Sequence, residues 1–286
     1  MKPYLLENIH CPDCSGNLDY DQIGQRFVCS ACGETVPAQD GIPLFSVPPE
    51  GIVPSEKLER GPDVGTPWRR ANWRFLAEQI NNLDDDALIL DVGAGRGDFA
   101  DALEGHDYLA LDVYPYPEVD VVCDLTQVNP LRSGRFDAIV LMNVLEHVYD
   151  TNSLFGALIE LLKTGGILVI AVPFLVKIHQ EPIDYIRYTH YALERLSEKH
   201  GLTTEILEGY YDPVFFLEEG IGNLRNAVLP TLQGSRRYIA RSMLSGIQRL
   251  ANSLKNVLGE GSSQPPAEVR SKAPTGYHVV YRKPAL

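Results

Sequence analysis

Long apolar runs and basic charge are what this sequence lacks. No stretch approaches the roughly eighteen consecutive apolar residues that cross a bilayer as a helix, and the N-terminal MKPYLLENIHCPDC has no apolar signal core. Lys and Arg number 25 against 38 Asp and Glu, so the formal net charge is -13. Because proteins that grip nucleic-acid phosphates carry a basic excess, we expect a cytoplasmic protein whose main partner is not a nucleic acid.

The composition is sufficient for two folded units. With 286 residues, 44% of them hydrophobic, the chain can form one large α/β domain and a smaller module. We expect the module in residues 1–46 and the larger domain in residues 68–286. Residues 47–67 hold five prolines and no apolar period, which predicts a linker between the two.

Cysteine is also scarce, and four of the five cysteines stand in two C-x2-C pairs. Cys11 with Cys14 and Cys29 with Cys32 form CPDC and CSAC, fourteen residues apart. Each pair can point two thiolates at one ion, so the spacing predicts a zinc ribbon in which all four hold a structural Zn²⁺. A purely structural role and recognition of RNA or a partner protein both stay open. Two basic against seven acidic residues in 1–50 make a poor grip on phosphate.

The ribbon sequence resembles the small zinc-ribbon proteins that activate translation-related methyltransferases. The resemblance includes the DGIPLF ending at residues 40–45. It implies contact between the ribbon and a methyltransferase domain, which here would lie in the same chain.

The stretch LILDVGAGRGDFA, residues 88–100, indicates the ligand of the larger domain. An apolar strand carries Asp91 near its end and runs into a G-x-G-x-G turn at Gly93, Gly95 and Gly97, after which a helix is expected. A carboxylate just before the turn is a poor neighbour for a pyrophosphate. It suits a ligand with an ammonium group, as S-adenosylmethionine has. The pattern therefore favours this methyl donor over NAD.

The following strands place more polar side chains at the same sheet edge. YLALDV carries Asp112, 21 positions after Asp91, where an acid can bind ribose hydroxyls, and VDVVCDL carries Asp124, which could accept from the adenine amine. A fourth strand leads to Asn143, and LKTGGILVIAVPF at 162–174 supplies a fifth. We expect five strands alternating with helices, with the acids at the edge where open α/β sheets bind ligands. The alternative is that these acids only cap helices and turns.

The larger domain resembles the class I S-adenosylmethionine-dependent methyltransferases. The motifs that carry the resemblance are DVGAGRG, the acids of LDV and CDL, FDAIVLMNVLEHV and the LKTGG turn. The family implies an α/β, Rossmann-like fold of seven strands in which the glycine loop lines the methionine part of the donor. It also implies that Asp112 binds ribose, that Asp124 and Leu125 flank adenine, and that Asn143 lies near the donor methyl group. The predicted donor contacts are Asp91, Gly93, Ala94, Gly95, Gly97, Asp112, Val113, Asp124, Leu125, Asn143 and Val144.

Two absent motifs narrow the choice of acceptor. The D/N-P-P-Y/F motif of nucleic-acid amino methyltransferases and the Pro-Cys nucleophile of cytosine-C5 enzymes do not occur. We therefore expect methylation of an oxygen on a small-molecule or glycan-type acceptor. Transfer from a sulfonium needs in-line positioning and at most one general base. His147 and His179 are the candidates for that base, and each is as readily a structural histidine.

The loop after the fifth strand reads KIHQEPIDYIRYTHYALERL, residues 177–196. We expect it to close over the acceptor and to contact it through Asp184, Tyr185 and Arg187. It resembles a block found in bacterial methyltransferases of surface-polysaccharide, other glycan and small-molecule pathways. Alternatively, it is a polar loop that leads into an ordinary helix capped by Thr189.

A helical insertion at about 214–275 separates the sixth and seventh expected strands, TTEILEGYY and GYHVVYRK, which the family joins by a tight hairpin. Within it, residues 236–258 form a basic amphipathic helix with five basic residues and no acid. Its apolar positions at helical spacing are Ala240, Met243, Ile247, Leu250, Leu254 and Val257. This helix either packs on the catalytic domain or across a homodimer, or it docks on an anionic substrate or the inner membrane surface.

Two further functions stay open. One is an rRNA or tRNA base methyltransferase that uses the ribbon to hold RNA, since zinc-bearing rRNA guanine methyltransferases share this layout. The other is a non-catalytic scaffold that keeps the donor pocket and acts through a protein partner. A salt-dependent shift of RNA would favour the first, and donor binding without turnover would favour the second.

Overall fold

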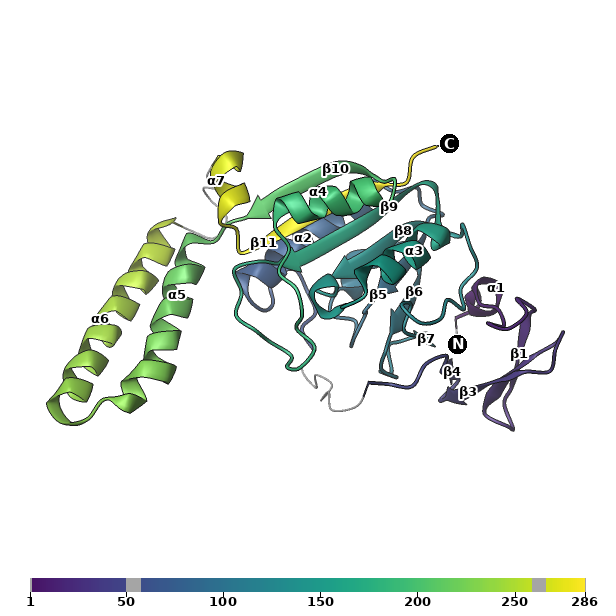
Figure 1. Ribbon diagram of the computed structural model, residues 1–286, viewed down its shortest axis with the longest axis horizontal. Helices are drawn as coiled ribbons and strands as arrows, with labels where there is room; N and C mark the ends of the chain where they lie inside the picture. Colours follow the sequence, from purple (N-terminus) through teal and green to yellow (C-terminus); the bar gives the residue numbers. More distant parts are fainter. Residues whose placement is uncertain (1, 50–57, 259–265, 286) are drawn as a thin grey trace.

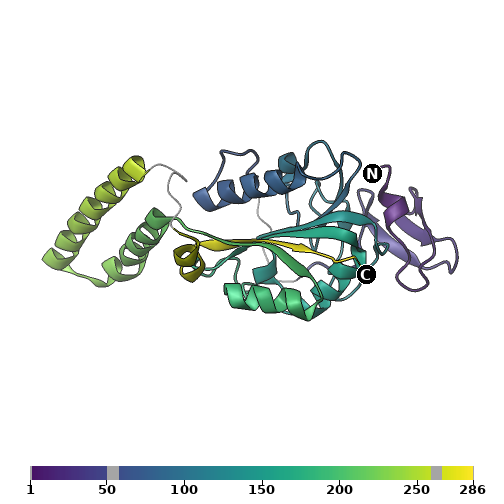
Figure 2. The same ribbon diagram turned by 90° about the horizontal axis from the view of Figure 1, so that it is seen from above.

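A central sheet separates two smaller parts of the molecule, as Figure 1 shows. The computed structural model describes residues 2–49, 58–258 and 266–285. The cysteine-containing ribbon lies at one end of the sheet and a helical hairpin at the other, and Figure 2 shows helices on both faces of the sheet between them. The chain is therefore elongated, with its parts arranged along one line.

The ribbon, at the N-terminal end, is a small antiparallel sheet preceded by one helical turn. Its strands lie in the order β1-β2-β3-β4. The elements are α1 (Leu5–Asn8), β1 (Leu18–Asp21), β2 (Arg26–Cys29), β3 (Thr35–Gln39) and β4 (Ile42–Pro43). Strands β1 and β2 pair as a hairpin between the two cysteine pairs, and β4 lies within the GIPLF stretch.

The central sheet has seven strands in the order β10-β11-β9-β8-β5-β6-β7. The strands are β5 (Leu88–Val92), β6 (Asp107–Asp112), β7 (Val121–Val122), β8 (Phe136–Met142), β9 (Leu162–Pro173), β10 (Thr203–Tyr210) and β11 (Gly276–Arg282). Neighbours from β9 to β7 run parallel, whereas β11 runs antiparallel to both β9 and β10. This order confirms the α/β, Rossmann-like fold of seven strands.

Three helices cover the two faces of the sheet. Helix α2 (Pro67–Ile80) packs on one face, and α3 (Thr151–Leu161) and α4 (His190–Lys199) pack on the other, as Figure 2 shows. Each starts where a side-chain oxygen accepts a backbone N–H: Thr66 from Arg69, Asp150 from Ser153 and Thr189 from Ala192. The predicted cap at Thr189 is thus present.

The expected alternation of the first five strands with helices is wrong for the donor half of the sheet. Among the described residues between β5 and β8, helical backbone is limited to a single 3-10 turn, Ala100–Leu103. Gly97 and Gly105 both have positive φ, at 73° and 97°, and they bracket only seven residues. Seven residues are too few for two α-helical turns. The connection after Asp112 is shorter than a helical crossover needs.

The ribbon extends the central sheet beyond its β7 edge. Leu44 forms a parallel bridge with Val122, and the Phe45 N–H donates to the Val122 carbonyl at 2.9 Å. On the other side, Ile9 bridges Leu131. Buried side chains of the ribbon and of the central sheet belong to one continuous apolar core, so the ribbon is packed onto the larger domain. A covered edge strand has no free row of backbone groups for another chain to pair with.

The insertion forms a helical hairpin that projects from the end of the sheet opposite the ribbon (Figures 1 and 2). It contains α5 (Pro213–Asn223), a π-helical turn (Leu224–Val228), a 3-10 turn (Leu229–Thr231) and α6 (Gly234–Leu258), and α7 (Ala267–Lys272) precedes β11. Ile221, Leu244 and Ala251 form its small core. Residues 259–265, between α6 and α7, lie outside the described part of the chain.

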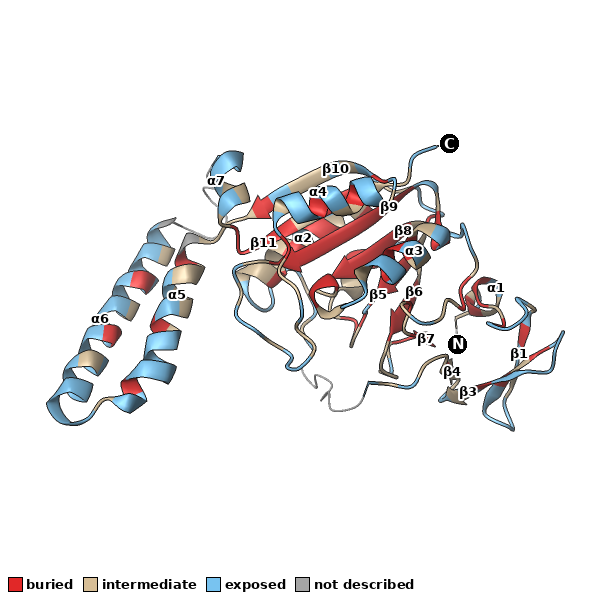
Figure 3. Ribbon diagram, in the orientation of Figure 1, coloured by how far each residue is buried: buried red, intermediate tan, exposed pale blue. Residues whose placement is uncertain are grey.

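The predicted apolar stripe of α6 faces solvent, as the pale blue of Figure 3 shows along this helix. Met243, Leu250 and Val257 are 63%, 71% and 83% exposed, whereas the buried positions are Leu244 and Ala251. Helix α6 therefore packs on α5 through one edge and presents a second apolar face outward.

Candidate functional site

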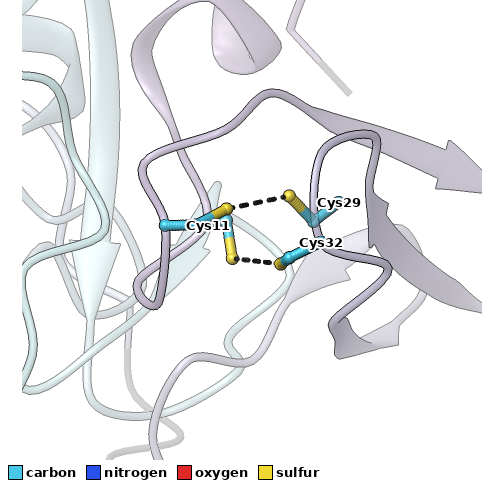
Figure 4. A group of neighbouring side chains, drawn as sticks. Cys11, Cys29 and Cys32 are labelled. Carbon is cyan, nitrogen blue, oxygen red and sulfur yellow. Dashed lines mark hydrogen bonds between the residues drawn. The ribbon is translucent and has the colours of Figure 1, made fainter.

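The four cysteines of the ribbon converge on one point. Their sulfur atoms all lie within 4.8 Å of one another, with Cys11 to Cys32 at 3.7 Å and Cys14 to Cys29 at 3.4 Å. Figure 4 shows Cys11, Cys29 and Cys32 pointing toward the same centre. A tetrahedron of Zn–S bonds of about 2.3 Å has edges of about 3.8 Å, so the spacing fits one zinc ion. A Cβ on Gly16 would lie 2.9 Å from the Cys29 sulfur, which explains a glycine there.

The first residues of the ribbon module contact strand β6. The Lys2 ammonium lies 2.8 Å from the Asp120 carboxylate, donates to the Tyr108 carbonyl at 2.6 Å and stands 3.6 Å from the centre of the Tyr108 ring. The Tyr4 hydroxyl donates to the same carbonyl. Because β7 and the loop after β9 lie on opposite sides of β5, the ribbon supports the glycine-loop side of the sheet and not the loop after β9.

The glycine loop after β5 adopts a conformation that other residues would strain. Gly93, Gly95 and Gly97 have φ values of 72°, 54° and 73°. A Cβ on Gly93 would lie 2.4 Å from a methyl carbon of Val144. The loop and the turn after β8 are therefore in direct contact, as the predicted donor pocket requires. Ala94 belongs to the same turn, and its N–H donates to the Leu111 carbonyl at 3.1 Å.

Asp91 and Asp112 are buried acids on neighbouring strands. Burial and, to a lesser degree, the nearby Asp112 raise the pKa of Asp91 to about 7, while Lys2 opposes the rise. Burial also raises the pKa of Asp112, although its oxygens accept from the N–H groups of Gly95 at 2.9 Å and Tyr114 at 3.0 Å. Two buried acids without a cationic partner between them suit a ligand that brings positive charge. Val113 follows directly on this strand end.

Asp124 lies beyond the end of β7 and closes its own turn. One oxygen accepts from the N–H and the hydroxyl of Thr126 at 2.9 and 2.7 Å, and the other accepts from the Gln127 amide at 2.5 Å. This is the turn-forming role that was the alternative for these acids. A carboxylate offers about four lone-pair positions, so Asp124 keeps acceptor capacity for a ligand amine. Leu125, the next residue, is buried beside it.

Asn143 is held in a left-handed turn at the end of β8. Its φ is 59°, and its side-chain oxygen accepts from the Trp68 indole at 2.9 Å. Trp68 stacks on His278 at 5.1 Å between ring centres, and His278 bonds to the Asn72 amide at 2.8 Å. Complete burial lowers the pKa of His278 to about 3, so this ring is neutral. Sequence reasoning missed this support because it comes from α2 and β11, far along the chain.

The segment before α2 packs on the glycine loop. The Glu59 N–H donates to the Asp98 carboxylate at 2.8 Å, and the Arg60 guanidinium donates to the Gly97 carbonyl at 2.9 Å. Arg69 donates to the carbonyls of Glu59 and Asp98. We call residues 58–66 the strap. Sequence patterns gave no signal for it, because its contacts use guanidinium and backbone groups without any period.

The turn after Val144 and the loop after β9 bring together Glu146, His147 and His179. The Glu146 carboxylate is fully buried, at 0% exposure, and neither of its oxygens has a hydrogen-bond partner among the described residues. The Nε2 atoms of His147 and His179 lie 3.6 and 3.7 Å from the same Glu146 oxygen. The two predicted histidines therefore meet across a carboxylate that was not predicted. We call these three residues the Glu146 cluster.

The predicted acceptor residues hold this cluster in place. The Asp184 carboxylate lies 3.2 Å from His179 Nδ1 and accepts two bonds from Arg187 at 2.5 and 2.6 Å. Burial opposes its charged form, but Arg187 and His179 outweigh this and lower the pKa of Asp184 to about 2. Tyr185 is 49% exposed and packs edge-on against Tyr149. Asp184 and Arg187 thus support His179, and Tyr185 lies at the surface.

Two family models match separate parts of the chain. Residues 67–204 match the model described as a methyltransferase domain, and residues 2–41 match the model described as a Trm112p-like protein. A UPF0434 protein of Shewanella sediminis is 48% identical over 41 residues, which are 14% of this chain and 68% of that protein. A ubiquinone biosynthesis O-methyltransferase of Pectobacterium atrosepticum is 33% identical over 94 residues, covering 27% of this chain and 39% of that enzyme.

Similar solved structures cover about three quarters of the chain. Phosphoethanolamine N-methyltransferase 2 of Haemonchus contortus, in complex with S-adenosyl-L-methionine, is 17% identical with a TM-score of 0.47 over 75% of this chain and 52% of that one. The 1,6-didemethyltoxoflavin-N1-methyltransferase of Burkholderia thailandensis is 15% identical, with a TM-score of 0.46 over 76% of this chain and 79% of that one.

Within the described part of the chain, no helix combines the length and apolar character needed to span a membrane.

Proposed function

Because this chain is an S-adenosylmethionine-dependent methyltransferase whose N-terminal segment belongs to the Trm112p-like zinc-ribbon family, we propose that it methylates an oxygen of a small-molecule or glycan-type acceptor. The observation that supports this best is the Glu146 cluster. It begins two residues after Val144, on the side of β8 where the donor methyl group is expected. The partial similarity to a ubiquinone biosynthesis O-methyltransferase points the same way.

The donor would lie over the carboxyl ends of β5 and β6. Asp91 faces its ammonium group, and the positive-φ turn from Gly93 lets its methionine part approach the backbone. Asp112 accepts from the ribose hydroxyls. The remaining proposed contacts are Ala94, Gly95, Gly97, Val113, Asp124, Leu125, Asn143 and Val144.

The chemistry asks little covalent help from the protein. The sulfonium carbon is already electrophilic, so the pocket has to align the acceptor oxygen with the S–C bond. In the step itself, the S–C bond breaks and an O–C bond forms, giving S-adenosylhomocysteine and a methyl ether. The acceptor proton moves to a base, for which His147 and His179 are our candidates.

Calorimetric titration with S-adenosylmethionine and with NADH tests the donor site first. We expect binding of the first ligand alone, loss of binding in Asp112→Ala and no loss in the matched control Asp107→Ala, at the exposed opposite end of the same strand. Binding of NADH instead would contradict the proposal. Methyl transfer to hydroxylated acceptors, read by mass spectrometry, then tests the oxygen. Product on RNA that is lost at high salt would favour the RNA alternative, and donor binding without any transfer would favour the scaffold.

A second proposal concerns α6, which we propose docks on an anionic membrane surface. Met243, Leu250 and Val257 form an exposed apolar row, and no acid lies in the helix. Apolar residues beside basic ones are the pattern that lies in the headgroup region of a bilayer. Cytoplasmic location and this peripheral contact remain our expectation.

Flotation with vesicles containing anionic lipid tests this contact. Replacing Arg236, Arg237 and Arg241 by Glu should release the protein from anionic vesicles, while neutral vesicles bind neither form. Equal flotation of both forms would remove the membrane proposal. Sedimentation at rising concentration then shows whether the apolar row pairs two copies into a homodimer instead.

A further inference from the structure

We propose that the Glu146 cluster binds a divalent transition-metal ion, separate from the four cysteines of the ribbon. The ion would have three protein ligands: a carboxylate oxygen of Glu146 and the Nε2 atoms of His147 and His179. This set of two imidazoles and one carboxylate suits ions from Mn²⁺ to Zn²⁺.

The first argument is a buried carboxylate whose oxygens accept no hydrogen bond from the described residues. The Glu146 side chain is completely buried, and neither carboxylate oxygen accepts a hydrogen bond from a described residue. The Nε2 atom of His147 is likewise buried without a partner. An isolated buried carboxylate is costly, so such groups are normally paired or bound to a metal. Here His147 Nε2 and Glu146 Oε1 lie 3.6 Å apart, which is too far for a hydrogen bond.

The second argument is the spacing of the three ligand atoms. The two Nε2 atoms lie 3.6 and 3.7 Å from one Glu146 oxygen, and all three lie within 4.8 Å of one another. Bonds of about 2.1 Å to a common ion separate its ligands by about 3.0 Å at right angles and about 3.6 Å at 120°. Small side-chain rotations therefore bring all three atoms into a coordination shell.

The third argument is that the other nitrogen of each histidine is already fixed. His147 Nδ1 lies 3.1 Å from the Ile183 carbonyl, and His179 Nδ1 lies 3.2 Å from the Asp184 carboxylate. A carbonyl or carboxylate on Nδ1 keeps the proton there and leaves the Nε2 lone pair for a metal. The Arg187 fork holds Asp184 in turn. Both supports come from the loop after β9, so the loop completes the site.

Three protein ligands leave a coordination position open, as in catalytic metal sites. The consequence for catalysis rests on the proposed methyl transfer to oxygen. An acceptor hydroxyl bound at the open position releases its proton to solvent more readily, and the resulting oxyanion attacks the donor methyl group with loss of S-adenosylhomocysteine. In that arrangement His147 and His179 act as ligands and no longer as bases.

Titration with Mn²⁺, followed by the electron paramagnetic resonance signal of the free ion, tests the site directly. The protein is used with zinc in the ribbon, because thiolates prefer zinc and the added Mn²⁺ then reports a nitrogen and oxygen site. We expect one Mn²⁺ per chain. Glu146→Gln and His179→Ala should each weaken binding at least tenfold, whereas Glu181→Gln and His190→Ala, the same changes outside the cluster, should not.

Two results would overturn the site. One is a folded wild-type protein that binds neither Mn²⁺ nor Co²⁺, nor any Zn²⁺ beyond the ribbon equivalent. The other is unchanged binding in both cluster variants. The titration needs neither donor nor acceptor, so it is independent of the proposed function. Metal binding without methyl transfer to any oxygen acceptor would sink the proposed function alone, and transfer that persists without bound metal would sink the catalytic role of the ion.

Discussion

Replacing Asp91 by Asn should stabilise the donor-free protein and abolish donor binding. The Asp91 carboxyl is 4% exposed, and burial followed by the neighbouring Asp112 raises its pKa to about 7 from the ordinary value of 3.8. Its charged form is therefore disfavoured in the folded protein until a cationic ligand arrives. Asn keeps the shape of the side chain and removes the charge.

The size of the effect follows from the two pKa values. Below the ordinary value of 3.8 the carboxyl is neutral in both the folded and the unfolded chain, so it costs nothing. As pH rises, the unfolded chain loses this proton first and folding stability falls, until the folded carboxyl ionises at about 7. The cost is about 2 kcal/mol at pH 5 and about 4 kcal/mol at pH 8. The gain from Asp91→Asn should therefore grow with pH, up to these values.

Donor binding should change in the opposite direction. If the ammonium group binds only the ionised carboxylate, the wild-type affinity should rise about tenfold between pH 6 and pH 8, because the ionised fraction rises by that factor. Asp91→Asn should bind weakly at both pH values. Urea unfolding and calorimetry at pH 5 to 8 measure the two effects, with Asp107→Asn as an exposed control on the next strand. The reasoning would be refuted if the gain in stability of Asp91→Asn over wild type were no larger at pH 8 than at pH 5.

Three other outcomes can be measured on the same protein. Gly93→Ala should lower stability by more than 1 kcal/mol and weaken donor binding, whereas Gly134→Ala, also at positive φ but with open space at its Cβ, should cost only the backbone strain of roughly 1 kcal/mol. Equal thermal shifts in both variants would contradict the predicted clash with Val144. Asp184→Asn should weaken Mn²⁺ binding about 10- to 100-fold through loss of the second hydrogen bond to His179, and unchanged affinity would contradict that supporting role. Removing zinc with a chelator should unfold the ribbon and expose the β7 edge, so that light scattering detects association; a chelated protein that stays monomeric with unchanged circular dichroism would argue against a structural ion.

The parts of the fold that the sequence predicted are those set by local patterns. The cysteine spacing fixes the ribbon because a knuckle is closed within four residues, and the apolar runs of the sheet are distinct because parallel strands are buried on both faces. The prediction of a helix after Gly97 was wrong for a local reason too. Gly97 and Gly105 both have positive φ, and only one 3-10 turn forms between these two glycines.

The parts that could not be predicted depend on contacts between distant segments. His147 and His179 are 32 positions apart, and nothing in either motif shows that both face Glu146. The strap at 58–66 has no apolar period, so its bonds to the glycine loop are invisible before folding. For α6, the spacing predicted an amphipathic helix correctly but could not say which apolar residues the neighbouring helix would bury.

The seam between the ribbon and β7 makes the two units inseparable by dilution. Two separate proteins joined by so few backbone hydrogen bonds would dissociate at low concentration. The covalent link through residues 47–67 keeps the two units at an effective concentration in the millimolar range. A separate ribbon protein could not bind at β7, because the ribbon of the same chain already occupies that edge. The stoichiometry of ribbon to enzyme is thus fixed at synthesis, and neither partner's expression level can regulate it.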